Sequence, residues 1–115
     1  MVKLKRASEK PAAADGCRVL VDRLWPRGLT MKKARLALWL RDIAPSPRLR
    51  KWFGHDPDRW LAFQRRYWAE LKEQRGLVSD LRTKSRHGTV TLVYAAHDED
   101  RNNAVALKRY LNRSR

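Results

Sequence analysis

Apolar residues gather in three short stretches that predict β-strands. Residues 2–5 alternate apolar and polar side chains, which is typical of a strand at the edge of a sheet. Residues 18–22 carry a continuous, β-branched apolar run, which is typical of a central strand covered on both faces. Residues 89–94 form a second strong strand. The pattern therefore predicts two buried strands and one edge strand.

The clearest helix has an apolar stripe at three- and four-residue spacing, formed by Trp60, Phe63, Tyr67 and Leu71. We expect Asp56 to cap this helix, with Pro57 in its first turn. Gly76 is expected to end it, and residues 77–82 predict a further short helix.

Two other helices begin at recognisable caps. Ser46 and Pro47 predict the start of a short helix that Gly54 ends. The chain closes with a helix that we expect Asp98 to cap, while residues 113–115 are expected to fray. The segment 30–43 is ambiguous, because its apolar residues suit both a strand and a helical stripe. We favour a brief helix capped by Thr30, followed by a third strand.

Strands that alternate with helices predict a small single α/β domain spanning residues 1–115. We expect a mainly parallel sheet of about three to four strands flanked by helices. The residues that follow the two buried strands would then meet at one sheet edge, where open α/β sheets usually bind ligands. The pattern thus predicts both a fold class and the place of a site.

The composition adds a strong basic charge to this picture. The 115 residues include 27 Lys and Arg against 12 Asp and Glu, a net charge of +15. Such a surface suits nucleic acid, although it is equally typical of a solvated basic surface. The lone Cys17, the absence of a signal-peptide pattern and the absence of a long apolar run favour a cytoplasmic protein.

The most informative motif is DRLWPRG, residues 22–28, directly after the first buried strand. Its arginines, Arg23 and Arg27, suit a carboxylate or phosphate. Trp25 would be a stacking wall beside them, and Gly28 completes a turn. The alternative is structural: Arg23 pairs with a carboxylate and Trp25 belongs to the core. We favour the site.

Two further segments carry candidate chemistry. His55 beside Asp56 suggests an oriented acid–base pair, although Asp56 also serves as a helix cap. After the second buried strand, Tyr94 and Asp98 precede Asn102, whose amide needs partners inside a helix. The histidines and the cysteine lack the spacing of a zinc site, so we expect no metal and no cofactor.

Four motifs in order resemble a known family. They are RVLVDRLWPRGL, WLRDIAPSPRLRKWFGHDPDRW, RYWAEL and TLVYAAHDEDRNNAVALKRYL. Together they closely resemble the YeaO-like short form of the bacterial family called domain of unknown function 488, over about residues 5–111. The resemblance implies a compact α/β domain and no established activity.

The resemblance also implies which positions belong to the family's motifs. They include residues 22–28 with the exception of Leu24. The others are Pro45, Ser46, Leu49, Arg50, Phe53, His55, Tyr67, Tyr94, Ala96, Asp98, Asn102 and Ala104. His97 stands where the family often has Lys, and Arg101 where it often has His. The cysteine of longer relatives is absent, so thiol chemistry does not carry over.

Two functions remain open from the sequence. The first is a pocket for a small anionic ligand, such as a nucleotide, bound by Arg23, Trp25, Arg27, Gly28, Ser46, Arg50, Tyr67, Tyr94 and Asn102. If the chain is an enzyme, Asp22, His55 and Asp98 are the candidates for acid–base roles. The second is nucleic-acid binding without catalysis, through Arg48, Arg50, Lys51, Arg65 and Arg66.

Overall fold

Four parallel strands form the predicted sheet, in the order β1-β4-β2-β3. The structure is a computed structural model that describes residues 1–113, so the C-terminal residues expected to fray lie largely outside the described part. The strands are β1 (Val2–Arg6), β2 (Cys17–Leu20), β3 (Leu38–Trp39) and β4 (Val90–Tyr94). The fold class is confirmed, with β1 at one edge and the short β3 at the other.

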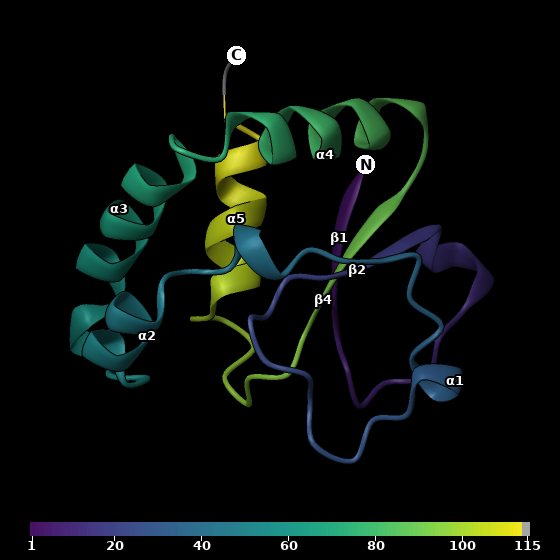
Figure 1. Cartoon of the computed structure of the whole chain (residues 1–115), viewed down its shortest axis with the longest axis horizontal. Coiled ribbons are helices and arrows are strands. Elements are labelled where there is room, and N and C mark those ends of the chain that lie inside the picture. The colour runs from purple at the N-terminus through teal and green to yellow at the C-terminus, as the bar shows by residue number, and fades with distance from the viewer. Residues whose placement is uncertain (114–115) are drawn as a thin grey trace.

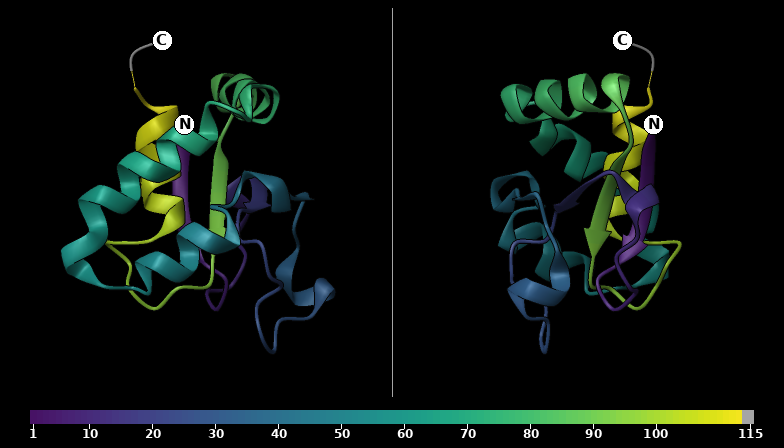
Figure 2. Two further views of the ribbon diagram at one scale, coloured as in Figure 1. Left: turned by 60° about the vertical axis from the view of Figure 1, so that its left-hand side comes forward. Right: turned by 90° about the vertical axis from the view of Figure 1, so that its right-hand side faces the viewer.

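Helices cover one face of the sheet and one of its ends (Figure 1). They are α1 (Met31–Ala34), α2 (Pro47–Phe53), α3 (Trp60–Leu71), α4 (Arg75–His87) and α5 (Asn103–Leu111). Helices α2, α3 and α5 lie on one side of the strands, and the loop that carries α1 lies on the other (Figure 2). Helix α4 crosses the end where the strands begin. The opposite end of the sheet, where the strands finish at their carboxyl ends, is therefore not covered by α4.

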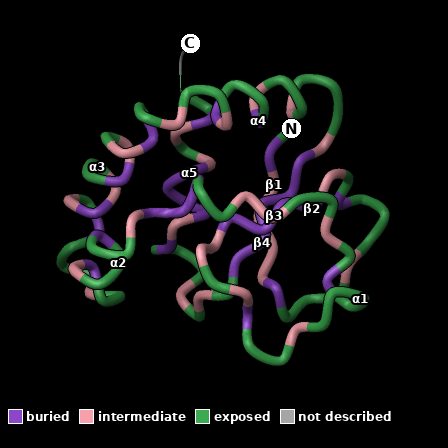
Figure 3. Tube along the Cα trace, viewed as in Figure 1, coloured by how far each residue is buried: buried purple, intermediate pink, exposed green. Residues whose placement is uncertain are grey.

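Successive side chains of the two central strands, β2 and β4, point to opposite faces of the sheet and belong to two apolar clusters. Val19 and Leu92 point to the helix-covered face and join a large core that includes Phe63. Leu20 and Val93 point to the other face and join a small cluster under the loop. Buried residues run through β2, β4 and most of α5, whereas β1 is mainly half-buried and the α1 loop is mostly exposed (Figure 3).

The caps decide where the helices begin, and most were predicted. Thr30 accepts a hydrogen bond from the backbone of Lys33, and Ser46 from that of Leu49. Asp56 accepts one from the backbone of Asp58, and caps a short 3₁₀ turn (Pro57–Arg59) that leads into α3. These expectations are confirmed, including a brief helix and then a strand in the ambiguous segment.

Two helix boundaries differ from the prediction. Helix α3 stops at Leu71, so Gly76 does not end it. Gly76 lies in the first turn of α4, where the surrounding space would accommodate a side chain. Asp98 does not cap α5, because the chain makes a further turn and Asn102 takes that position. Within residues 1–113, no helix has both the length and the apolar character that crossing a membrane requires.

Candidate functional site

A cavity of about 600 Å³ opens at the carboxyl edge of the sheet, and both predicted motifs line it. We name it the strand-end cavity. Its apolar walls are Leu24, Trp25, Pro26, Ala44, Pro45, Phe53, Phe63, Ala95 and Ala96. Its polar groups are Asp22, Arg23, Arg50, His55, His97, Asp98, Asn102 and Asn103. The ends of β2 and β4 thus meet at one cavity, together with residues from α2, α3 and the start of α5.

Asp22 joins the two strand ends at the base of this cavity. Its carboxylate accepts hydrogen bonds from the backbone N–H of Ala95 at 2.9 Å and from the side chain of Asn103 at 3.0 Å. Asn103 also donates to the carbonyl of Val21 at 3.0 Å. Burial raises the pKa of Asp22, and the two donors together with the charge of Arg50 only partly oppose it. This carboxylate therefore has its oxygens already engaged.

The two arginines of the cavity differ in how they are held. Arg23 donates to the carbonyls of Ala44 at 3.2 Å and Pro45 at 3.4 Å through Nη2 and Nε. Across residues 1–113, its Nη1 atom and the whole guanidinium of Arg50 donate to no protein acceptor. Fixed and free guanidinium groups together can bind an anion.

His55 is presented to the cavity by an unusual backbone. It follows Gly54 at the end of α2, and both residues have left-handed φ angles, 58° for His55 and 54° for Gly54. Left-handed backbone in a non-glycine residue often marks a functional position. The neighbouring Asp56 directs its carboxylate to Asp58 and Arg59 rather than to the imidazole. The suggested His55–Asp56 pair is therefore not formed.

Asp98 and Asn102 line the cavity while shaping the chain around it. Asp98 accepts hydrogen bonds from the backbone of Asp100 and Arg101, which hold the pKa of its carboxyl below the usual value. Asn102 caps α5 by accepting from Val105, and donates to the carbonyl of Asp98, each at 2.9 Å. Its side chain is thus committed to the fold.

Several predicted ligand residues lie outside the strand-end cavity. Tyr67 is fully buried and donates to the carbonyl of Ile43, while Tyr94 belongs to the core. Ser46 caps α2 and donates to Glu70. Arg27 and Gly28 line a second cavity of about 1080 Å³. Arg23 and Arg27 therefore do not form one clamp, since the Trp25–Pro26 segment separates them.

The residues proposed for nucleic-acid binding lie on the outer surface of α2 and α3. Arg48, Lys51 and Arg65 are exposed. Arg66 is stacked on Trp52, with its guanidinium carbon 4.0 Å from the ring centroid, and Arg59 lies 5.1 Å from the same centroid. Both arginines therefore occupy positions beside the indole where a base would have to stack. Arginine–aromatic stacking thus accounts for part of the basic surface.

Asn103 and His97 line the cavity, although neither is among the candidate site residues predicted from the sequence. Only the structure shows that Asn103 reaches Asp22. The signal lay in the adjacent Asn residues, since a helix start can use one as a cap and leave the next free. Within residues 1–113, no three His, Cys, Asp or Glu side chains gather closely enough to hold a metal ion.

Comparisons with known proteins show which family this chain belongs to. A family model described as "DUF488-N3i: Inactive DUF488-N3 subclade" matches residues 1–114. The uncharacterised protein Rv3073c of Mycobacterium tuberculosis (strain ATCC 25618 / H37Rv) is 39% identical over 111 residues, which cover 96% of this chain and 93% of that protein. The uncharacterised protein YeaO of Escherichia coli (strain K12) is 37% identical over 112 residues, 96% of each chain. No solved structure matches.

Proposed function

Because the chain belongs to the DUF488-N3i family, described as an inactive subclade, we propose that it binds a small anionic ligand in the strand-end cavity without transforming it. Among residues 1–113, the lining carries no Ser, Thr, Cys, Tyr or Lys side chain, and Cys17 lies at the start of β2, the opposite end of the strand. A binding role therefore agrees with the family description and with the residues present.

One observation carries the proposal: among the described residues, two arginines of the cavity keep donors without a protein acceptor, while its two carboxylates already accept hydrogen bonds. Asp22 and Asp98 accept protein hydrogen bonds, and Asp98 also lies 3.6 Å from Arg101. Arg50 and the Nη1 atom of Arg23 have no protein acceptor within the described chain. An entering ligand thus meets available donors, which suit a phosphate or a carboxylate.

The apolar walls favour an anion that carries a flat group. Phe53 and Phe63 line the cavity but belong to the buried core, where they are stacked on each other with ring centroids 4.3 Å apart. Trp25 is half-buried, lines the same cavity and lies edge-on to Trp39, with ring centroids 5.3 Å apart. A cavity of about 600 Å³ has the size of a small-molecule site. A nucleoside monophosphate combines the two properties.

The test is a titration of the full chain with AMP and with inorganic phosphate, followed by ¹H–¹⁵N NMR. We expect AMP to shift the backbone signals of Ala95 and Ala96 and the side-chain amide of Asn103. Arg50→Ala should weaken AMP binding by roughly ten- to a hundredfold, because a hydrogen bond to a charged group contributes about 1.5–3 kcal/mol. Arg48→Ala is the matched control, since Arg48 lies on the same helix but not in the cavity.

The same titration separates this proposal from nucleic-acid binding by the outer surface. Under that alternative, a single-stranded oligonucleotide binds more tightly than AMP, its affinity falls steeply with salt, and Arg48→Ala weakens it as much as Arg50→Ala. Equal losses from the two variants, or shifts spread over α2 and α3, would contradict the cavity proposal.

A further inference from the structure

The second cavity differs from the first in its charge. We name it the basic cleft; it has a volume of about 1080 Å³ and is built from the end of β1, the following loop and the α1 segment. Its cationic residues are Arg6, Lys10, Arg27, Lys32, Lys33 and Arg35. Glu9 is the single acidic residue in its lining. The cleft therefore gathers positive charge that nearby acids do not balance.

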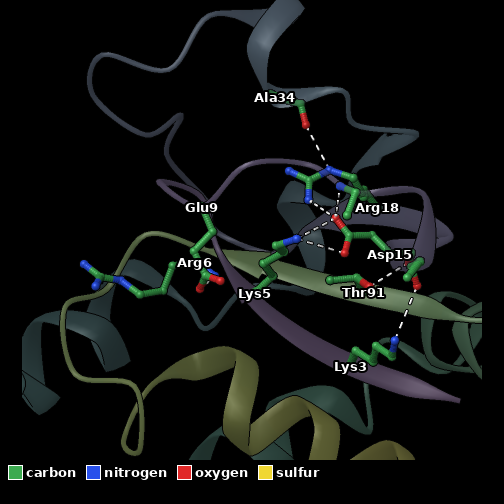
Figure 4. A network of polar contacts seen from close by, with 10 residues as sticks. Lys3, Lys5, Arg6, Glu9, Asp15, Arg18, Ala34 and Thr91 are labelled. Carbon is green, nitrogen blue, oxygen red and sulfur yellow. Dashed lines mark hydrogen bonds and ion pairs between the residues drawn. The ribbon is translucent and has the colours of Figure 1, made fainter.

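None of these six cations forms an ion pair within residues 1–113. The contrast with a neighbouring group is clear in Figure 4, where Lys5 and Arg18 converge on the buried carboxylate of Asp15. Glu9 accepts from the backbone N–H of Arg6 and so closes a turn. Unpaired cations around a concave surface raise the local concentration of anions.

Arg6 shows a second sign of a missing partner. Its side chain points away from the Asp15 network (Figure 4), and its Nε atom is buried without an acceptor among the described residues. Buried donors of this kind are rare and need an explanation. The Nη2 atom of Arg6 lies 3.4 Å from Nδ1 of His97. The guanidinium thus sits at the boundary between the two cavities.

The two cavities are adjacent and share part of one wall. Pro26, Ala95 and His97 line both of them. All aromatic side chains of this region, apart from His97, belong to the strand-end cavity, and the basic cleft is lined by no Phe, Tyr or Trp. Bases bind by stacking on aromatic rings, whereas phosphates need cations and donors. The two compartments therefore suit the two ends of one molecule.

We infer that the two cavities together bind a nucleotide that carries two or more phosphates. This inference rests on the proposed function: the base lies against the half-buried Trp25, and the first phosphate meets Arg50. The phosphate chain then passes His97 into the basic cleft, where Arg6, Arg27 and Lys33 bind its outer charges.

The test compares AMP, ADP and ATP, with inorganic tripolyphosphate and a single-stranded RNA decamer as further probes. For the wild-type chain we expect affinity to rise at least fivefold with each added phosphate. The double variant Arg27→Ala/Lys33→Ala should reduce ATP to the affinity of AMP and leave AMP unchanged. Arg75→Ala/Lys84→Ala removes the same charge from exposed positions on α4, at the other end of the sheet, and should leave the series intact.

Each other outcome overturns the inference in an identifiable way. If AMP binds through Arg50 but the series is flat, the basic cleft takes no phosphates while the proposed function stands. If tripolyphosphate binds through Arg27 and Lys33 but AMP does not bind, the proposed function fails and the cleft is a separate anion site. Tighter binding of the RNA decamer, lost in the same double variant, assigns the cleft to nucleic acid. Equal losses in the control variant assign the effect to net charge.

Discussion

The two faces of the sheet are covered by different kinds of structure, and their chemistry differs accordingly. On the helix-covered face, Val19 and Leu92 join an apolar core that continues through α2, α3 and α5. On the loop-covered face, Leu20 and Val93 form only a small apolar cluster. There the buried carboxylate of Asp15 binds the chain segments together. Helices supply enough apolar surface for a core, whereas a loop needs charged and polar bonds to hold its backbone.

The lining of each cavity has the chemistry of the segments that cover the sheet beside it: the helices on one face and the α1 loop on the other. The strand-end cavity takes its aromatic wall, Phe53 and Phe63, from α2 and α3. The basic cleft takes its cations from loops and from the four-residue helix α1, whose side chains are mostly exposed. Because a helix stripe must be apolar and a loop tip is free to carry charge, the division of the site follows from the division of the fold.

The largest effect should come from removing leucine on either face. Leu92 and Leu20 are both fully buried, on opposite faces. We expect Leu92→Ala to cost about 4 kcal/mol of unfolding free energy and Leu20→Ala about 2–3 kcal/mol, because the loop can collapse into the space and packed helices cannot. Urea denaturation of both variants measures this. Equal losses would show that the loop is as rigid as the helix layer.

The second prediction breaks the charge network of the loop-covered face. Asp15 accepts hydrogen bonds from Arg18 at 2.8 Å, from Lys5 at 3.0 Å and from the backbone of Ala12 at 2.9 Å. Removing its charge leaves Arg18, itself buried, without its partner. We expect Asp15→Asn to cost about 3 kcal/mol, measured by urea denaturation. Asp80→Asn, at an exposed position on α4, is the control and should change little.

The same carboxylate gives that stability a pH dependence. Burial by itself would raise the pKa of Asp15, but the donors from Ala12, Lys5 and Arg18 outweigh it and hold the pKa below its ordinary value of 3.8. The contribution of Asp15 is therefore complete above that ordinary value and is lost as the pH falls through the folded-state value. The gap between wild type and Asp15→Asn should narrow on acidification below about pH 4. A constant gap would contradict the network.

The sequence predicted local features of the molecule better than contacts between distant segments. Periodic stripes and caps such as Ser46 are local signals, because the cap bonds a backbone N–H three residues away. The Asp15 network was not predicted, since its members come from three separate segments. The second buried strand was placed correctly, but nothing local shows that Thr91 donates to the carbonyl of Asp15.

The structure brings part of the predicted set of site residues together at one cavity and places the others elsewhere. Parallel strands bring their carboxyl ends to one edge, so residues 22–26 and 95–98 share a cavity as expected. Tyr67 and Tyr94 lie in the core rather than in the lining of the cavity, because a family motif does not distinguish a core position from a wall. Arg27 belongs to the same motif as Arg23 and was expected to bind the same anion, but it lines the other cavity.

The third prediction concerns the hydrogen bond that joins the strand ends. Asn103→Ala removes the donor to Asp22 and should cost about 2 kcal/mol near pH 7. That donor favours the charged carboxyl, so its loss should raise the already raised pKa of Asp22 further. The stability loss should therefore shrink at low pH, where Asp22 is protonated. A ¹³C NMR titration of the Asp22 carboxyl measures the pKa, with the exposed Asn112→Ala as control.

The smallest expected effects come from the two helix caps, one beside each cavity. Each cap holds a short helix that carries cationic residues of its cavity. Ser46 caps α2, which carries Arg50, and Thr30 caps α1, which carries Lys32 and Lys33. Ser46→Ala should cost about 1 kcal/mol and Thr30→Ala about 0.5 kcal/mol, since α1 is short and exposed.

The two cap variants should also divide ligand binding between the cavities. Ser46→Ala loses the bond to Glu70 as well as the cap, so it loosens α2 and should weaken AMP about twofold. Thr30→Ala should leave AMP unchanged and reduce only the gain from AMP to ATP. Ser79→Ala, at an exposed position of α4, should change neither. If Thr30→Ala weakened AMP as much as Ser46→Ala does, the two covers would not serve separate parts of the ligand.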